Sequence, residues 1–207
     1  MIRRRGAAAL ATSVAAVAVA GCLFRSAEAP RFYRPAAAAL DDPGSTSAAA
    51  TGAALRVGSV HSAPFLRERV VWRSSSVEYG LYDQRRWFEL PSRYVRRALI
   101  ATLEKTPGIR LVQDPQALRL DVEVLAFDEV LAPVHEAHVA LVITLRDGAE
   151  SRLEHRFVAK APIANTTGAA MAEAMGRALD EATRQAAAAV AAALGERSAL
   201  PTAPRPR

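Results

Sequence analysis

The chain has very little cysteine and very little lysine. Its 207 residues include one cysteine, Cys22, and two lysines, Lys105 and Lys160, so arginine supplies nearly all of the positive charge. One cysteine cannot form an intrachain disulfide, and packing alone must therefore hold the fold together. We interpret the bias toward arginine and alanine as the base composition of the genome rather than as a sign of function.

Motifs of several enzyme classes are also missing. The sequence has no Gly-x-Ser-x-Gly nucleophile elbow and no phosphate-binding loop between a strand and a helix. His135 and His138 are three residues apart, whereas zinc proteases place two histidines four apart on a helix. His155 falls on the inward face of an expected strand, which favours a core or edge histidine over a catalytic base. We expect no enzyme activity, no metal site and no cofactor.

Net charge argues against a nucleic-acid partner. The chain has 27 basic and 21 acidic residues, a formal charge of +6. Arg3, Arg4 and Arg5 would be lost with a cleaved signal peptide, which leaves 24 basic residues and a charge of +3. No basic stripe with interleaved aromatic residues remains in the mature part.

Residues 1–21 have the organisation of a lipoprotein signal peptide. The arginines are followed by an uncharged run, 6–21, which leads into Val-Ala-Gly-Cys at 19–22, the form of a bacterial lipobox. This pattern predicts cleavage between Gly21 and Cys22 and lipidation of the Cys22 thiol. The alternative is a plain signal anchor, but a spanning helix needs ~20 apolar residues, more than this run provides. Leu23 stands where an aspartate would retain an enterobacterial lipoprotein in the inner membrane, so we expect an outer-membrane anchor facing the periplasm.

Composition divides the mature chain into three parts. Residues 22–53 are rich in Ala, Pro, Ser, Thr and Gly and predict the lipidated cysteine followed by a flexible tether. Inside this part, Arg-Phe-Tyr-Arg at 31–34 is either a short strand docked on the domain edge or a solvated linker. We expect one folded domain over 54–196 and a disordered tail over 197–207.

The periodicity of the domain predicts an α+β fold. Apolar and polar residues alternate, or β-branched residues gather, in seven segments: 55–60, 70–75, 77–82, 109–112, 118–126, 137–146 and 151–161. Helical spacing appears from Pro91 to the Pro107-Gly108 pair and again over 167–194. One-sided alternation is typical of antiparallel sheets with one wet face. We therefore predict a mostly antiparallel sheet with two helices packed on one face.

A dense aromatic and basic segment precedes the first helix. It contains Arg85, Arg86, Trp87 and Phe88. One interpretation is that Trp87 and Phe88 pack the helix onto the sheet. The other is that these four residues bind a protein partner or lipid headgroups, with buried aromatic anchors and arginine hydrogen bonds. The sequence leaves both interpretations open.

Taken together, these segments resemble the ABC-type transport auxiliary lipoprotein family, the group that contains paraquat-inducible protein C. The resemblance rests on the lipobox and on the order and spacing of five further pieces. These are Phe-Tyr-Arg at 32–34, Leu-Arg-Val-Gly at 55–58 followed by Pro-Phe-Leu at 64–66, Val-Val-Trp-Arg-Ser at 70–74, Tyr-x-x-x-Arg-Trp-x-Glu-x-Pro at 82–91, and Leu-Asp-Val-Glu-Val at 120–124 ahead of Phe127. The segment around Arg86-Trp87 is the most specific of them.

This resemblance implies a role without catalysis. Such lipoproteins accompany mammalian-cell-entry (MCE) proteins and an ABC permease that move phospholipid between the two membranes. The implied partners are thus an MCE-domain protein and the permease complex, with contact to phospholipid and homo-oligomerisation left open. The alternatives are an unrelated outer-membrane assembly lipoprotein and a lipid-tethered periplasmic enzyme.

Overall fold

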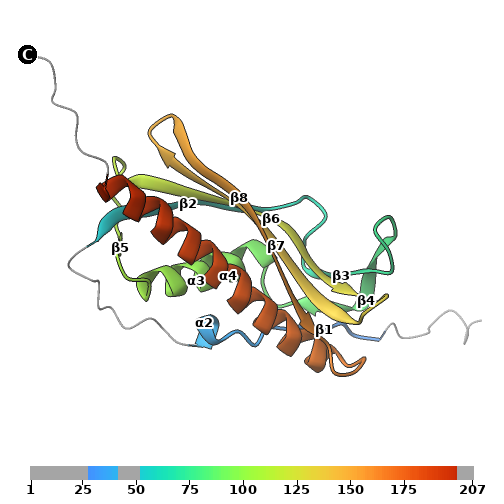
Figure 1. Ribbon diagram of the computed structural model, residues 1–207. Coiled ribbons are helices and arrows are strands. Elements are labelled where there is room, and N and C mark those ends of the chain that lie inside the picture. Colours follow the sequence, from blue (N-terminus) through green and yellow to red (C-terminus); the bar gives the residue numbers. More distant parts are fainter. Residues whose placement is uncertain (1–27, 42–51, 200–207) are drawn as a thin grey trace, which may run out of the picture. The chain divides into compact units, whose positions relative to one another are not determined.

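The computed structural model describes residues 28–41 and 52–199 (Figure 1). Gly21 and Cys22, and the tail beyond Ala199, lie outside this part of the chain. The described elements are β1 (Arg31–Tyr33), α2 (Ala38–Asp41), β2 (Ala53–Ser62), β3 (Arg69–Arg73), β4 (Tyr79–Trp87), α3 (Pro91–Glu104), β5 (Ile109–Leu111), β6 (Leu118–Val130), β7 (Glu136–Asp147), β8 (Glu150–Pro162) and α4 (Gly168–Ala199).

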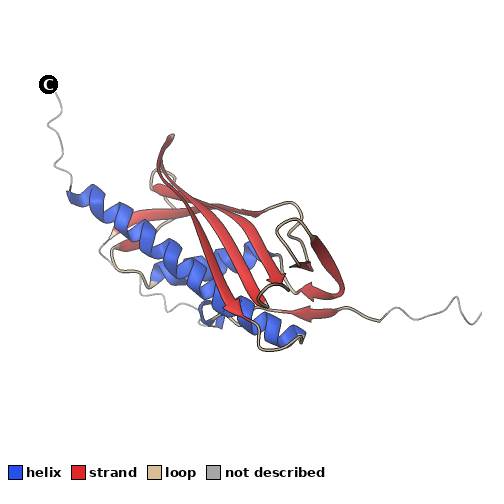
Figure 2. Cartoon of the chain, turned by 45° about the vertical axis from the view of Figure 1, so that its right-hand side comes forward, coloured by secondary structure: helices blue, strands red, loops and turns tan. Residues whose placement is uncertain are grey.

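The long strand β6 is the centre of one sheet, whose strands are drawn in red beside the blue helices in Figure 2. Along one edge it pairs with β7, which in turn pairs with β8, and both ladders are antiparallel. Along the other edge it pairs in parallel with β2 in its first half and with β3 near its end. The sheet therefore divides beyond β6 into two branches, β2–β5 and β3–β4–β1.

The predicted α+β class is confirmed, with the longest ladders antiparallel. Strands β3 and β4 form an antiparallel hairpin around 74–76, where the Ser75 hydroxyl accepts hydrogen bonds from the backbone of Val77 and Glu78. The parallel pairings, β1–β4, β2–β5, β2–β6 and β3–β6, were not predicted. Parallel partners must be joined by long crossovers, so residue alternation within one strand carries no sign of them.

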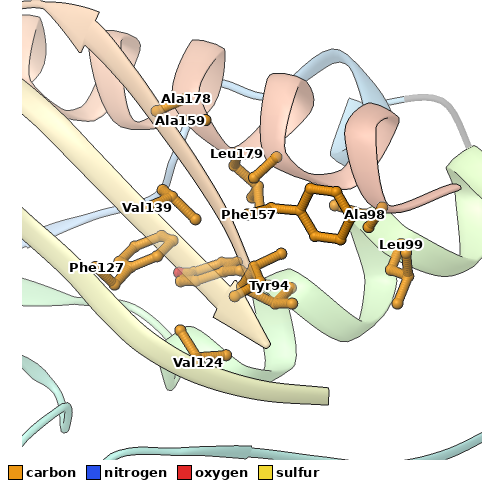
Figure 3. Close-up of a cluster of buried hydrophobic side chains, with 14 of the residues drawn as sticks. Tyr94, Ala98, Leu99, Val124, Phe127, Val139, Phe157, Ala159, Ala178 and Leu179 are labelled. Atoms are coloured by element: carbon orange, nitrogen blue, oxygen red, sulfur yellow. The ribbon is translucent and has the colours of Figure 1, made fainter. Parts of the chain in front are cut away.

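Helices α3 and α4 pack on one face of the sheet, as the apolar spacing predicted (Figure 1). In α3, Val95, Leu99 and Leu103 are all fully buried. Figure 3 shows Tyr94 and Leu99 of α3 and Leu179 of α4 beside Phe127 and Val139 of the sheet. The last helix ends at Ala199 rather than at the expected residue 194.

Part of the interval expected to be a flexible tether is folded onto the domain. Strand β1 pairs in parallel with β4, with Tyr33 opposite Trp87. The backbone N–H of Ala36 donates to the Ala172 carbonyl (3.1 Å), and the Asp180 carboxylate accepts from the first residues of α2. The strand interpretation of 31–34 is therefore correct, and the domain begins near Arg31 rather than at residue 54.

This docking requires a glycine in α4. A Cβ at Gly176 would lie 2.1 Å from the Ala36 carbonyl oxygen, whereas a Cβ at Gly195 of the same helix would meet nothing within 4 Å. We expect Gly176→Ala to loosen residues 31–41, because backbone atoms block the added methyl group. Gly195→Ala makes the same chemical change without the clash.

Hydrogen–deuterium exchange of the two full-length variants tests this expectation. Faster exchange over 31–41 is expected in Gly176→Ala alone, with the strands β6–β8 protected in both. Equal exchange over 31–41 in the two variants would contradict the proposed contact.

Candidate functional site

The segment 85–88 alternates between the interior and the surface. Trp87 is 1% exposed and lies edge-on against Phe127, with ring centroids 5.1 Å apart. Phe88, its neighbour, is 71% exposed. Trp87 thus packs in the core. The packing interpretation expected the same of Phe88, but the Phe88 side chain lies at the surface.

Arg85 also points inward and forms a buried ion pair. Its Nη1 lies 3.0 Å from Oε2 of Glu129, and its Nη2 donates to the Thr166 carbonyl (2.7 Å). Nε2 of His135 lies 2.6 Å from the other Glu129 oxygen. Burial raises the pKa of Tyr82 to about 12, and the charge of Glu129 and a hydrogen bond to it act in the same direction. This cluster joins β4, β6, the β6–β7 turn and the loop before α4.

A second buried cluster surrounds Asp128, the residue before Glu129. Nε of Arg73 lies 2.7 Å from Oδ2 of Asp128, in an ion pair without hydrogen-bond alignment. Nδ1 of His138 lies 3.0 Å from Oδ1 of Asp128 and 3.1 Å from Nη2 of Arg73. Successive side chains of a strand point to opposite faces, so the two carboxylates bind arginines on opposite sides of the sheet.

The three histidines His135, His138 and His155 therefore lie at separate sites in the fold. His135 and His138 contact different carboxylates, while His155 is exposed and lies beside Phe157, with ring centroids 4.6 Å apart. Across residues 28–41 and 52–199, no three His, Cys, Asp or Glu side chains are grouped so as to hold a metal ion. Both carboxylates have arginine partners on other strands, Arg73 on β3 and Arg85 on β4, so no sequence motif marks these clusters.

An apolar hollow of about 510 Å³ opens at the β3–β4 end of the sheet. It is lined by Phe65, Val71, Tyr79, Gly80 and Leu81. Val71 pairs with Asp128 on β6, so it lies on the face opposite Phe127 and the helices. This hollow is therefore on the side of the sheet that α3 and α4 leave uncovered.

The hollow presents large apolar side chains to solvent. Phe65, Tyr79 and Leu81 are 49%, 51% and 43% exposed, and the rings of Phe65 and Tyr79 meet edge-on. Exposed apolar side chains gathered around a concavity are typical of interaction sites rather than of inert surface. The Asp128 cluster lies on the same face, next to Val71, and joins β3, β6 and β7 beside the hollow.

Comparison with known proteins identifies the fold and the family. The sequence pattern of the ABC-type transport auxiliary lipoprotein component matches residues 39–187, more than two thirds of the chain. The chain belongs to this family. The match begins in α2 and runs into α4, so it covers strands β2 to β8, the hollow and both ion-pair clusters but not β1.

Solved structures share the family fold. A Xanthomonas campestris protein of family DUF330 is 17% identical and has a TM-score of 0.70 over 82% of this chain and 99% of that one. A hypothetical protein from Chlamydia trachomatis is 9% identical, with a TM-score of 0.51 over 70% of this chain and 98% of its own. At these identities the likeness concerns the fold alone. The comparison with curated proteins gives no match.

Membership makes the chain an auxiliary lipoprotein component of an ABC-type transport system. A lipoprotein is held at the membrane by its acyl chains and exposes its domain to the periplasm. In the described residues, no helix has both the length and the apolar character that crossing a bilayer requires. The recognised resemblance is therefore confirmed at the level of the family.

Proposed function

We propose that this lipoprotein is a non-catalytic docking component of an MCE/ABC-type system that moves phospholipid between the inner and outer membranes. Lipidated Cys22 anchors it in the outer membrane, facing the periplasm, and the domain binds an MCE-domain protein of the permease complex. Leu23 after the cysteine supports the choice of membrane, and the family match supports the role in transport.

The apolar hollow is the observation that carries this proposal. Protein interfaces gain most of their affinity from a few large side chains that enter well-formed pockets. A hollow of about 510 Å³ with three half-exposed apolar side chains at its rim fits such an anchor. Gly80 lies between these side chains but faces the other side of β4, where a Cβ would lie 2.2 Å from the Trp72 ring.

Affinity purification of the full-length protein from detergent-solubilised membranes tests this role. We expect the wild type to retain an MCE-domain protein and the ABC permease. The double substitution Tyr79→Ser and Leu81→Ser should abolish this recovery, because it removes apolar contact area from the hollow without touching the helix-covered core. Val158→Ser is the matched control, since Val158 is 43% exposed on the opposite edge strand β8.

The same experiment separates the proposal from its alternatives. Recovery of lipopolysaccharide-assembly or β-barrel-assembly proteins with the wild type would favour an unrelated outer-membrane assembly role. Full recovery of the MCE partner by the folded double variant would show that the hollow is not part of the interface. Equal thermal unfolding midpoints for wild type and double variant establish that the variant is folded.

A further inference from the structure

Docking of β1 makes the link between the lipid anchor and the domain short. A tether that lasted to residue 53 would contain 31 residues after Cys22, whereas β1 begins at Arg31 and leaves eight, 23–30. An extended chain spans at most about 3.5 Å per residue, so Arg31 lies within about 30 Å of the Cys22 backbone. With Cys22 lipidated as proposed above, this chain length keeps the edge of the sheet that carries β1 within reach of the membrane surface.

That edge exposes two aromatic side chains beside an arginine. Phe32 of β1 is 59% exposed and pairs with Arg86 of β4, so the two side chains share a face. Phe88 follows two residues after Arg86 on the same side and is 71% exposed. Its backbone N–H donates to the Tyr33 carbonyl (2.8 Å), which fixes it against the end of β1. We call Phe32, Arg86 and Phe88 the β1-edge patch.

The arginine of this patch has no counter-ion among the described residues. Nε of Arg86 is buried and has no hydrogen-bond partner. The nearby carboxylate of Asp83 is paired with Arg69, and the exposed Glu68 forms no ion pair with Arg86. The neighbouring Arg85 is paired with Glu129 inside the domain. An external anion that binds the terminal Nη groups of Arg86 would therefore displace no ion pair of the described residues.

We propose that the β1-edge patch contacts the phospholipid headgroups of the membrane that holds the Cys22 acyl chains. The two phenyl rings insert at the headgroup boundary, and the Arg86 guanidinium binds a lipid phosphate through two parallel hydrogen bonds. This inference rests on the proposed lipidation of Cys22, since the anchor supplies the nearby surface. The contact holds the β1 edge of the domain at the membrane; the hollow lies on the same uncovered face of the sheet, one strand further in at β3 and β4.

Quenching of a fluorophore by lipid tests the patch in the lipidated full-length protein. Acylated Cys22 has no free thiol, so one introduced cysteine is labelled selectively. Phe88→Cys places the fluorophore in the patch and keeps Phe32 and Arg86, and Val158→Cys places it on the opposite edge of the sheet. The labelled proteins are reconstituted in vesicles of phosphatidylethanolamine and phosphatidylglycerol that include a lipid with a nitroxide on its headgroup.

We expect several-fold stronger quenching of the fluorophore at 88 than at 158, and a decrease at 88 when Arg86→Gln is added. Equal quenching at the two positions would overturn the inference, as would shielding of position 88 by a second copy of the chain or by a protein partner. Flotation with the vesicles reports the anchor separately. If the wild type floated no better than Cys22→Ser, Cys22 would not anchor the protein. The proposed contact of the β1-edge patch with headgroups would then be overturned as well.

Discussion

Replacing Trp87 with alanine is expected to lower the free energy of unfolding by about 3–5 kcal/mol, the range for an aromatic side chain truncated in a core. The Trp87 ring is 1% exposed and meets Phe127 and Tyr94 edge-on, at centroid distances of 5.1 and 6.4 Å. Tyr94 and Phe127 belong to α3 and β6, so the cavity would loosen the contact between helix and sheet. Urea denaturation followed by circular dichroism measures the loss.

Phe88→Ala is the matched control for this substitution. It truncates a large aromatic side chain one residue away, but that side chain is 71% exposed and a surface change costs about 0.5 kcal/mol or less. Similar losses of stability for the two variants would show that the alternation of this segment is assigned incorrectly. The comparison therefore tests the orientation of β4 as well as the depth of one residue.

Helices and long strands of this fold were predictable because each shows its buried face in its own sequence. The spacing of Val95, Leu99 and Leu103 identified the buried side of α3, and all three residues are fully buried. The alternation over 118–126 likewise identified the core face of β6, where Leu120, Val122 and Val124 point inward. These signals are local, because each element shows its buried face in its own sequence whatever it packs against.

Segment 85–88 was not predictable in the same way. The β3–β4 ladder changes register between Arg69 and Val71, and such an irregularity shifts which residues of β4 point inward. A shift of one residue in the strand pairing reverses the face of every following side chain. The register therefore decides whether Trp87 or Phe88 is buried. The sequence therefore placed two aromatic and two basic residues together without separating core from surface.

The buried clusters and the docked N-terminal segment were hidden for a related reason. Glu129 and Asp128 obtain their partners from β3, β4 and the β6–β7 region, as many as 55 residues away in the case of Arg73 and Asp128. The segment 31–41 is rich in alanine, and its docking depends on the absence of a side chain at Gly176. Neither arrangement leaves a periodic pattern along the chain.

Arg85→Ala is expected to lower the free energy of unfolding by about 3 kcal/mol, the lower end of the range for breaking a buried ion pair. The substitution would leave the Glu129 carboxylate, which is 2% exposed, without its arginine. It would also remove the hydrogen bond to the Thr166 carbonyl and the contact of the guanidinium with the Tyr82 ring, 4.3 Å from its centroid. His135 and Tyr82 still contact Glu129, which limits the loss.

Arg86→Ala supplies the control, because it deletes the same side chain one position along the strand. Arg86 neutralises no carboxylate in the described residues and its buried Nε has no partner, so its removal should change stability by about 0.5 kcal/mol or less. Its expected effect lies at the membrane, where it should weaken the headgroup contact of the β1-edge patch. A destabilised Arg86→Ala together with an unaffected Arg85→Ala would reverse the assignment of the two arginines, and with it the division of this segment into an internal support and an external contact.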